Sequence, residues 1–446
     1  MSDTLTYTYN SPSRFLQSAA QDALFLSKYA EVQKQSAPCF FWGTLADPYI
    51  TARCLITLSN VVQSSFSLSP ADLARIKDPI VTAGEGRIRF EGFSQCAGVY
   101  SRVDILPAGH DGEFPASGTT NVDFNQPMIS ALSGIQRKEK LLLSVGEKEV
   151  GIQNDQGKII ERKVPLPTKW IKGLASVQVF LSEAEKEYSF NRMQALQLFQ
   201  SLPTGKPRQD YFLTVRGARP IFSTVYTSGS VTIGGVHRLK LLEPLLPLAT
   251  ELKLFPHADQ QSTSWQLYFG GVRFNLTLSR DAWRGFSGEG AGLEGLVEDM
   301  PDEWLDAFDK YSFANQSFNP TLVAVEEDLD FDRVSNLAAR LSAMGLLGYD
   351  LDDNQFFYRR LPFKLSRIMS LNPRLKAAEQ LLAEDKVDIL STAGDRVEAR
   401  VAGSGVDHTV IIDGDQQRCT CTWFSRHQGE RGPCKHVLAV KKKLNR

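Results

Sequence analysis

Two periodicities alternate along the chain, and each predicts a different element. Asp47 and Pro48 read as an N-cap followed by a proline at the first helical position. Apolar residues from Ile50 to Val62 then recur at helical spacing, which predicts a helix. Over residues 87–106 the pattern changes to apolar runs separated by glycines, which predicts strands.

The next part of the chain predicts a hairpin followed by a helix. The hairpin strands are expected at residues 140–145 and 159–164, with the turn at 154–157, where asparagine, aspartate and glycine gather. The prolines at residues 165–167 break the chain. Helical spacing then predicts a helix over residues 182–202.

Strands dominate residues 210–278, apart from a helix expected near 237–245, and a shorter helix is expected to begin at Ser69. A glycine-rich loop at residues 285–292 leads into a further predicted helix, and it overlaps a formal G-x-G-x-x-G at residues 290–295. This loop lacks the Gly-Lys-Ser/Thr of a phosphate-binding loop, and acidic residues follow it. A flexible or tightly packed loop is therefore favoured over a phosphate site.

A helix and a hairpin are predicted in succession further on. Asp332 is a candidate cap for a helix that ends at Gly345. Strands are expected at residues 346–351 and 355–361, around a polar turn at 352–354. This order suits a winged-helix-like arrangement or an ordinary α+β corner, and the ordinary corner is the commoner of the two.

The C-terminal part predicts a helix from Pro373 to Leu382 and paired strands at residues 397–401 and 409–412. No repeat is visible in the sequence. The predicted fold is therefore α+β and multidomain, with a mixed α/β N-terminal body and a C-terminal ββα unit. The expected divisions are residues 1–165, 166–320, 321–365 and 366–446.

Composition and charge narrow the classes of function. The chain has 446 residues, 42% of them hydrophobic, and a formal net charge of −1. A neutral chain has no overall attraction to nucleic acid or membranes, so any such attraction must be local. Residues 294–332 hold twelve Asp or Glu and one Lys, so the rest of the chain is basic. No signal peptide or membrane span is recognised, which predicts a cytoplasmic protein with reduced thiols.

A cysteine cluster is the most specific chemical signal. Three of the six cysteines are scattered and are expected in the core, whereas Cys419, Cys421 and Cys434 lie close to His436. Three thiols and an imidazole are a ligand set for tetrahedral zinc. Two cysteines two apart on an extended segment point to the same side. We therefore predict one structural zinc, because four ligands leave no open position for catalysis.

The surroundings of the cluster support this prediction. Pro433 is expected at the first position of a helix, which places Cys434 in a first turn whose free N–H groups favour a thiolate. His427 is a competing ligand, but it is expected in the middle of a loop without a paired partner. The last thirty-one residues, 416–446, hold eight Lys or Arg and one acid, Glu430, which offsets the residual negative charge of the site.

The stretch from Cys419 to Trp423 and the stretch from Gly432 to Ala439 resemble the SWIM-type zinc finger, whose pattern is Cys-x-Cys, a variable gap and Cys-x-His. The resemblance covers about residues 390–446. Looser likeness to an uncharacterised bacterial family of SWIM zinc finger proteins lies in residues 90–93, 118–124, 283–290 and 347–350. It implies zinc binding, DNA or protein binding, and a bacterial setting beside MoxR-type AAA+ ATPases and von Willebrand A proteins.

Basic and aromatic residues around the cluster are the candidate contact surface. Such residues can bind phosphates and stack on bases, or they can simply complement a helix end and keep the tail soluble. The candidates are Arg418, Trp423, Arg426, Arg431, Lys435, Lys441, Lys442 and Lys443.

Three classes of function stay open at this point. Nucleic-acid binding through the finger and a protein adaptor role rank almost equally. An enzyme is less favoured, because no Gly-x-Ser-x-Gly or comparable catalytic pattern is found.

Overall fold

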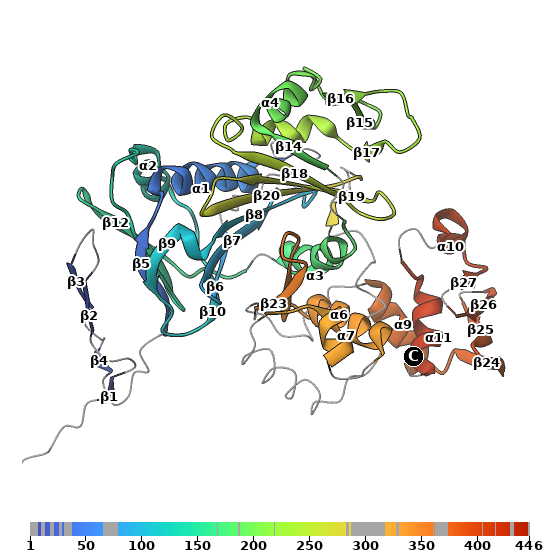
Figure 1. The fold of residues 1–446 in the computed structure, drawn as a ribbon. Helices are drawn as coiled ribbons and strands as arrows, with labels where there is room; N and C mark the ends of the chain where they lie inside the picture. Colours follow the sequence, from blue (N-terminus) through green and yellow to red (C-terminus); the bar gives the residue numbers. More distant parts are fainter. Residues whose placement is uncertain are drawn as a thin grey trace, which may run out of the picture.

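The computed structural model describes most of the chain from residue 38 onwards (Figure 1). The described residues are 8–9, 14–17, 22–25, 29–30, 38–65, 79–166, 168–185, 188–217, 219–281, 285–286, 317–326, 330–359, 361, 373–403, 405–414, 416–428 and 432–444. Near the N-terminus, Thr8–Tyr9 (β1) pairs with Tyr29–Ala30 (β4), and Arg14–Gln17 (β2) pairs with Asp22–Phe25 (β3). Predicted features at residues 69–72, at most of 285–316 and at Arg431 lie outside the described residues.

The first half of the body alternates single helices with groups of antiparallel strands. Its elements are β5 (Cys39–Leu45), α1 (Pro48–Gln63), β6 (Ile80–Gly84), β7 (Arg87–Phe93), β8 (Val99–Ile105), η2 (Pro107–Gly109), β9 (His110–Glu113), β10 (Gly118–Asn121), α2 (Gln126–Gly134), β11 (Leu142–Gly146), β12 (Glu149–Asn154) and β13 (Gly157–Arg162). They form a five-stranded sheet in the order β13-β12-β11-β5-β9 and half of a larger sheet in the order β10-β6-β7-β8.

The second half of the body follows α3 (Thr168–Ser182). Its elements are β14 (Tyr188–Asn191), α4 (Arg192–Gln200), β15 (Tyr211–Arg216), β16 (Arg219–Ser223), β17 (Val231–Ile233), η3 (Val236–Leu242), β18 (Glu251–Pro256), β19 (Ser262–Tyr268) and β20 (Val272–Ser279). Strand β20 pairs with β8 and completes an eight-stranded antiparallel sheet, β10-β6-β7-β8-β20-β19-β18-β14. This sheet draws strands from both sides of residue 165. The four expected divisions of the chain stay a prediction.

The two halves repeat one pairing plan, which the sequence did not reveal. Strand β5 pairs with β11, the first strand after α2, and β14 pairs with β18, the first strand after η3. In each half the strand after the first helix lies between its hairpin partner and a later strand (β7-β6-β10, β16-β15-β17). Strand pairing depends on alternating burial and not on residue identity, so a repeated plan can persist without a repeated sequence.

Helix α1 begins as predicted. The Asp47 side chain accepts a hydrogen bond from the Ile50 N–H at 2.9 Å, and Pro48 occupies the first turn. Much of the helix is buried against β7, β8 and α2, with Leu55, Leu58 and Cys54 at 2% exposure or less. Burial also raises the pKa of the Cys54 thiol, which therefore behaves as a small core residue.

Two sequence predictions in this body were wrong. The turn at residues 154–157 joins β12 to β13, and β12 lies between the two strands predicted to pair directly. The helix predicted over 182–202 is α4 alone, because residues 188–191 form a strand that pairs with β18. Helix α3, whose buried residues include Trp170 and Leu174, was also not predicted. Its apolar residues lie all around the helix and are interrupted by buried Ser176 and Gln178, so no apolar stripe marks it in the sequence.

The helix and hairpin predicted over residues 332–361 are confirmed, and a short strand and a short helix precede them. The elements are β21 (Ser317–Phe318), α6 (Pro320–Glu326), α7 (Phe331–Ala343), β22 (Leu347–Asp350) and β23 (Gln355–Tyr358), with sheet order β21-β23-β22. Gly345 has φ +78°, and the Leu346 N–H donates to the Leu341 carbonyl at 2.9 Å, so the helix ends in a Schellman motif. Helix α7 begins at Phe331, which puts Asp332 inside the first turn and not at the cap.

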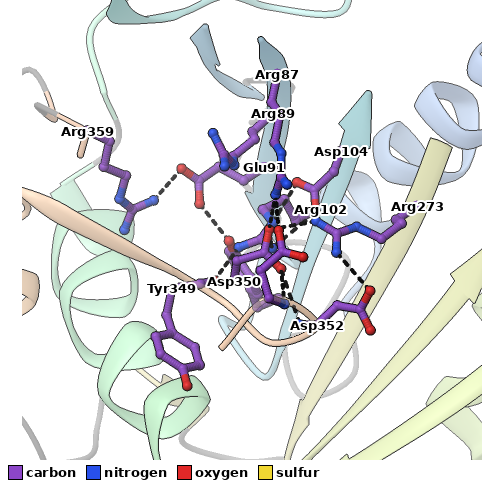
Figure 2. Close-up of polar contacts among 12 residues, drawn as sticks. Arg87, Arg89, Glu91, Arg102, Asp104, Arg273, Tyr349, Asp350, Asp352 and Arg359 are labelled. Atoms are coloured by element: carbon purple, nitrogen blue, oxygen red, sulfur yellow. Dashed lines mark hydrogen bonds and ion pairs between the residues drawn. The ribbon is translucent and has the colours of Figure 1, made fainter. Parts of the chain in front are cut away.

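The acidic turn of this hairpin docks on an arginine-rich face of the large sheet (Figure 2). Asp350 accepts from Arg273 at 2.6 Å and from Arg87 at 3.0 Å. Asp104, on β8, pairs with Arg102 at 2.8 Å. Burial opposes ionisation of Asp350, but Arg273 and the neighbouring arginines lower its pKa overall, so the carboxylate form is favoured. The charges are therefore paired within the chain.

The C-terminal region has its own core. Its elements are α9 (Pro373–Ala383), β24 (Val387–Ala393), β25 (Arg396–Ala402), β26 (Asp407–Asp413), β27 (Gln416–Cys419), α10 (Thr422–His427) and α11 (Lys435–Lys443). The predicted strands β25 and β26 and the predicted helix α9 are confirmed, and β24 and β27 extend the sheet to the order β24-β25-β26-β27. In this core, Val397 and Val410 of the sheet pack with Leu375 of α9 and Val437 of α11.

The overall class is mixed helix and sheet, as predicted. No helix in the described part of the chain combines the length and the apolar character needed to cross a bilayer.

Candidate metal centre

Three short backbone features bring four ligand side chains together. Cys419 is the last residue of β27, which pairs with Val410 of β26. Cys421 is the N-cap of α10, and its sulfur accepts a hydrogen bond from the Phe424 N–H at 3.4 Å. Cys434 is the N-cap of α11, and His436 lies in the first turn of that helix.

The ligand atoms have the spacing of a tetrahedral site. The three sulfurs and one His436 ring nitrogen all lie within 4.8 Å of one another. His436 Nδ1 is 3.7 Å from Cys419 Sγ and 4.0 Å from Cys434 Sγ. Zinc bonds of about 2.3 Å to sulfur and about 2.0–2.1 Å to nitrogen give tetrahedral edges of about 3.5–3.8 Å. The residues therefore fit a zinc-sized ion, with Nδ1 as the histidine donor.

The site is buried, and its thiols differ in acidity. The exposed fractions are 8% for Cys419, 4% for Cys421, 2% for Cys434 and 3% for His436. The neighbouring Cys419 thiol, the His436 ring and the Val437 N–H lower the pKa of Cys434. The hydrogen bond to Cys434 raises the pKa of Cys419, and burial raises that of Cys421. A dication would stabilise all three thiolates, so metal binding is expected to release protons.

The segment that holds the ligands is similar to a known protein family. Residues 408–445 match the family model described as the SWIM zinc finger. Residues 408–445 are a SWIM-type zinc finger. All four ligand residues lie inside the matched segment, and the match together with the Cys₃His cluster supports zinc binding. No curated protein matches the chain.

Some solved structures resemble part of the chain weakly. A PCNA2–PCNA3 complex from Sulfolobus tokodaii matches with 9% identity and a TM-score of 0.38, covering 54% of this chain and 99% of that chain. Proliferating Cellular Nuclear Antigen from Entamoeba histolytica matches with 11% identity, a TM-score of 0.38 and the same coverage. The DNA polymerase III subunit beta from Pseudomonas aeruginosa matches with 11% identity and a TM-score of 0.35, covering 53% of this chain and 64% of that chain. Likeness of this strength says nothing about what the chain binds.

Two local predictions about the SWIM finger need correction. Helix α11 begins at Lys435, so Pro433 precedes the helix and Cys434 is its N-cap and not part of its first turn. The Cys434 sulfur makes no cap hydrogen bond, although the nearby Val437 N–H still helps to lower its pKa. His427 lies on α10 and not in a loop, with its ring 4.9 Å from that of Trp423. It is not a member of the ligand cluster.

Arg374 is a supporting residue that the sequence did not suggest. Its guanidinium donates to the Pro433 carbonyl at 2.8 Å and lies 4.7 Å from the centre of the Trp423 ring. These contacts join α9 to both arms of the SWIM finger, the loop before Cys434 and the helix after Cys421. One face of Trp423, predicted to stack on a base, is therefore occupied by Arg374. The only sequence signal was its place at the start of a predicted helix.

The predicted contact residues separate into two groups. Arg418, Arg426 and Lys435 are exposed. Lys442 pairs with Glu379 of α9 at 3.0 Å, and Lys443 pairs with Asp385 at 3.5 Å while donating to the Val387 carbonyl. Lys441 is half-buried on α11, and Trp423 is half-buried on α10. Lys442 and Lys443 thus stabilise the C-terminal region itself.

Proposed function

We propose that the chain is a nucleic-acid-binding protein whose SWIM finger is organised by one structural zinc ion. Three thiols and an imidazole nitrogen suit zinc better than the oxygen-preferring cations. Four ligands fill a tetrahedral shell, which leaves no open position for a substrate. The zinc would be held by Cys419, Cys421, Cys434 and His436 and would supply folding energy to the surrounding loops.

One observation carries the binding proposal: three exposed cations close in sequence to the ligands have no ion-pair partner in the part of the chain that the structure describes. Arg418, Arg426 and Lys435 form no ion pair with any described residue, in contrast to Lys442 and Lys443. Arg418 adjoins one ligand in sequence, and Lys435 lies between two others. The metal would therefore fix their positions relative to one another. Free cations on a fixed frame are suited to the phosphates of DNA.

The test is a salt titration of DNA binding with the full chain. Fluorescence anisotropy of a labelled duplex should give a log–log slope against salt that Arg418→Glu with Arg426→Glu reduces by roughly two contacts, or about 1.8. The matched control is Lys386→Glu with Arg396→Glu, which reverses two exposed charges in the same module. Equal slopes for the two double variants, or binding without salt dependence, would contradict the proposal.

A protein adaptor is the second candidate. The observation in its favour is an exposed apolar pair, Val225 at 65% and Tyr226 at 60%, with the Tyr226 ring 5.4 Å from that of Phe212. Exposed aromatics are frequent anchors in protein interfaces. Partners such as AAA+ ATPases and von Willebrand A proteins, and a bacterial cytoplasmic setting, stay predictions. Affinity purification with nuclease treatment distinguishes the candidates, because only partners held directly survive the nuclease.

A further inference from the structure

One buried arginine of the body lacks the close carboxylate that its neighbours have. Arg102 pairs with Asp104 at 2.8 Å and Arg273 pairs with Asp350 at 2.6 Å. Arg89 is 2% exposed. Among the described residues, a single carboxylate lies within ion-pair distance of it, that of Glu85 at 3.6 Å. Like the Nε atoms of Arg102 and Arg273, its Nε is buried without a hydrogen-bond partner in the described part of the chain. Buried charges are costly unless they are closely paired.

Arg89 belongs to a polar row that crosses the eight-stranded sheet. Thr119 of β10 is directly opposite Thr82 of β6, which is opposite Arg89 of β7. Arg89 is in turn opposite Asp104 of β8, which is opposite Arg273 of β20. Residues in register on adjacent antiparallel strands share one face. At the end of the row formed by Asp104 and Arg273, Asp350 of the hairpin pairs with Arg273.

The other end of the row opens into a cavity of about 470 Å³. Arg89, Thr82 and Thr119 line it, and the two threonine hydroxyls lie 3.1 Å apart. Phe40 contributes an apolar wall, and Lys163 lies exposed at the rim, without an ion pair among the described residues. This volume is within the range of small-molecule sites, which combine apolar walls with a few convergent polar groups.

The charges around the cavity favour a ligand of low negative charge. Arg359 also lines the cavity, but it is engaged by Glu91 and by the Leu174 carbonyl. Glu85 and Glu147 lie on the wall as well, which disfavours polyanions. Burial raises the pKa of Glu85 and so favours its neutral form. Arg89, whose guanidinium also lies 3.8 Å from the centre of the Phe357 ring, and Lys163 are the lining cations without a carboxylate closer than 3.6 Å among the described residues.

We propose that this cavity binds a small molecule bearing one oxyanion group, phosphate or carboxylate, on Arg89, Lys163 and the hydroxyls of Thr82 and Thr119. The apolar remainder of the ligand would lie against Phe40. Guanidinium, ammonium and hydroxyl groups are the donors that such groups accept. The site is independent of the SWIM finger, since every residue that lines it belongs to the body or the docked hairpin.

Calorimetric titration of the full chain with inorganic phosphate, acetate and 5′-AMP tests the proposal. At least one probe should bind saturably, and the pattern among the three tells a phosphate site from a carboxylate site. Thr82→Val with Thr119→Val should weaken that binding roughly tenfold, because both hydroxyl donors are lost while volume is kept. Lys163→Met, at the rim, should weaken it as well.

The matched control is Ser264→Ala with Thr277→Val. These residues form another buried hydroxyl pair of the same sheet, 2.8 Å apart, and neither lines the cavity. This variant should bind as the wild type does, and both double variants should keep the wild-type circular dichroism spectrum. The proposal is overturned if no probe binds saturably, or if the two double variants bind equally well.

Discussion

The SWIM finger and the sheet–hairpin junction are both built around buried polar groups, but they neutralise them differently. At the junction, Asp350 and its arginines compensate one another within the chain at distances down to 2.6 Å. In the finger, three thiols and His436 converge on a space suited to a cation. The junction should therefore be stable by itself, whereas the finger should depend on a metal. The two regions are therefore expected to differ in stability and to unfold separately when the metal is removed.

Metal removal should give the largest difference in stability between the two regions. A chelator, or Cys434→Ser, should unfold the finger and leave the body intact, because structural zinc contributes on the order of 10–16 kcal/mol in small fingers. Limited proteolysis with mass spectrometry should place new cleavages within residues 373–444. Cys96→Ser is the control, since Cys96 is half-buried and far from the ligands in sequence. Cleavages that appear equally in the body would refute the separation of the two regions.

Asp350→Asn should give the next largest effect, at the junction. It leaves buried Arg273 without its closest carboxylate and should lower the free energy of unfolding by roughly 3–5 kcal/mol. Chemical denaturation with a body tryptophan such as Trp265 as the probe measures this. Zinc content should stay unchanged, which is the contrast with Cys434→Ser.

The same substitution predicts a pH dependence. The folded pKa of Asp350 is lowered, so its contribution is fully present above the unfolded pKa of about 3.9 and is lost as pH falls below it. The difference in stability between wild type and Asp350→Asn should therefore shrink from about pH 5 downwards. A difference that grows on acidification would contradict the pairing.

Arg374→Met should have a moderate effect confined to the finger. It removes the link from α9 to the Pro433 carbonyl and to Trp423 while keeping apolar bulk. Loss of groups that orient a metal site typically weakens metal binding about 10–100-fold. Competition with a zinc indicator measures the change. Unaltered zinc affinity would mean that the matched segment 408–445 is sufficient without α9.

Lys442→Met should have the smallest effect. Its pair with Glu379 is partly exposed, with side-chain exposures of 26% and 45%. Such pairs contribute about 0.2–1 kcal/mol, so the finger's melting temperature should fall by no more than about 8 °C. A larger fall would show that the α9–α11 contact matters more than its exposure suggests.

The parts that could be predicted from sequence are those whose partners are near in the chain. Cys419 to His436 form one short motif, and Asp47 caps a helix three residues away, so spacing alone was informative. The docking of Asp350 could not be predicted, because Arg273 and Arg87 lie 77 and 263 positions away. The same holds for the Arg89 row, which depends on strand register. Helix α10 was too short for its periodicity to be recognised.

The measurement that tests the account most directly is the metal content of the full chain by native mass spectrometry, with thiols kept reduced. The account predicts one zinc per chain in the wild type and none in Cys434→Ser. A wild-type chain that folds with the same finger but holds no stoichiometric metal would contradict it.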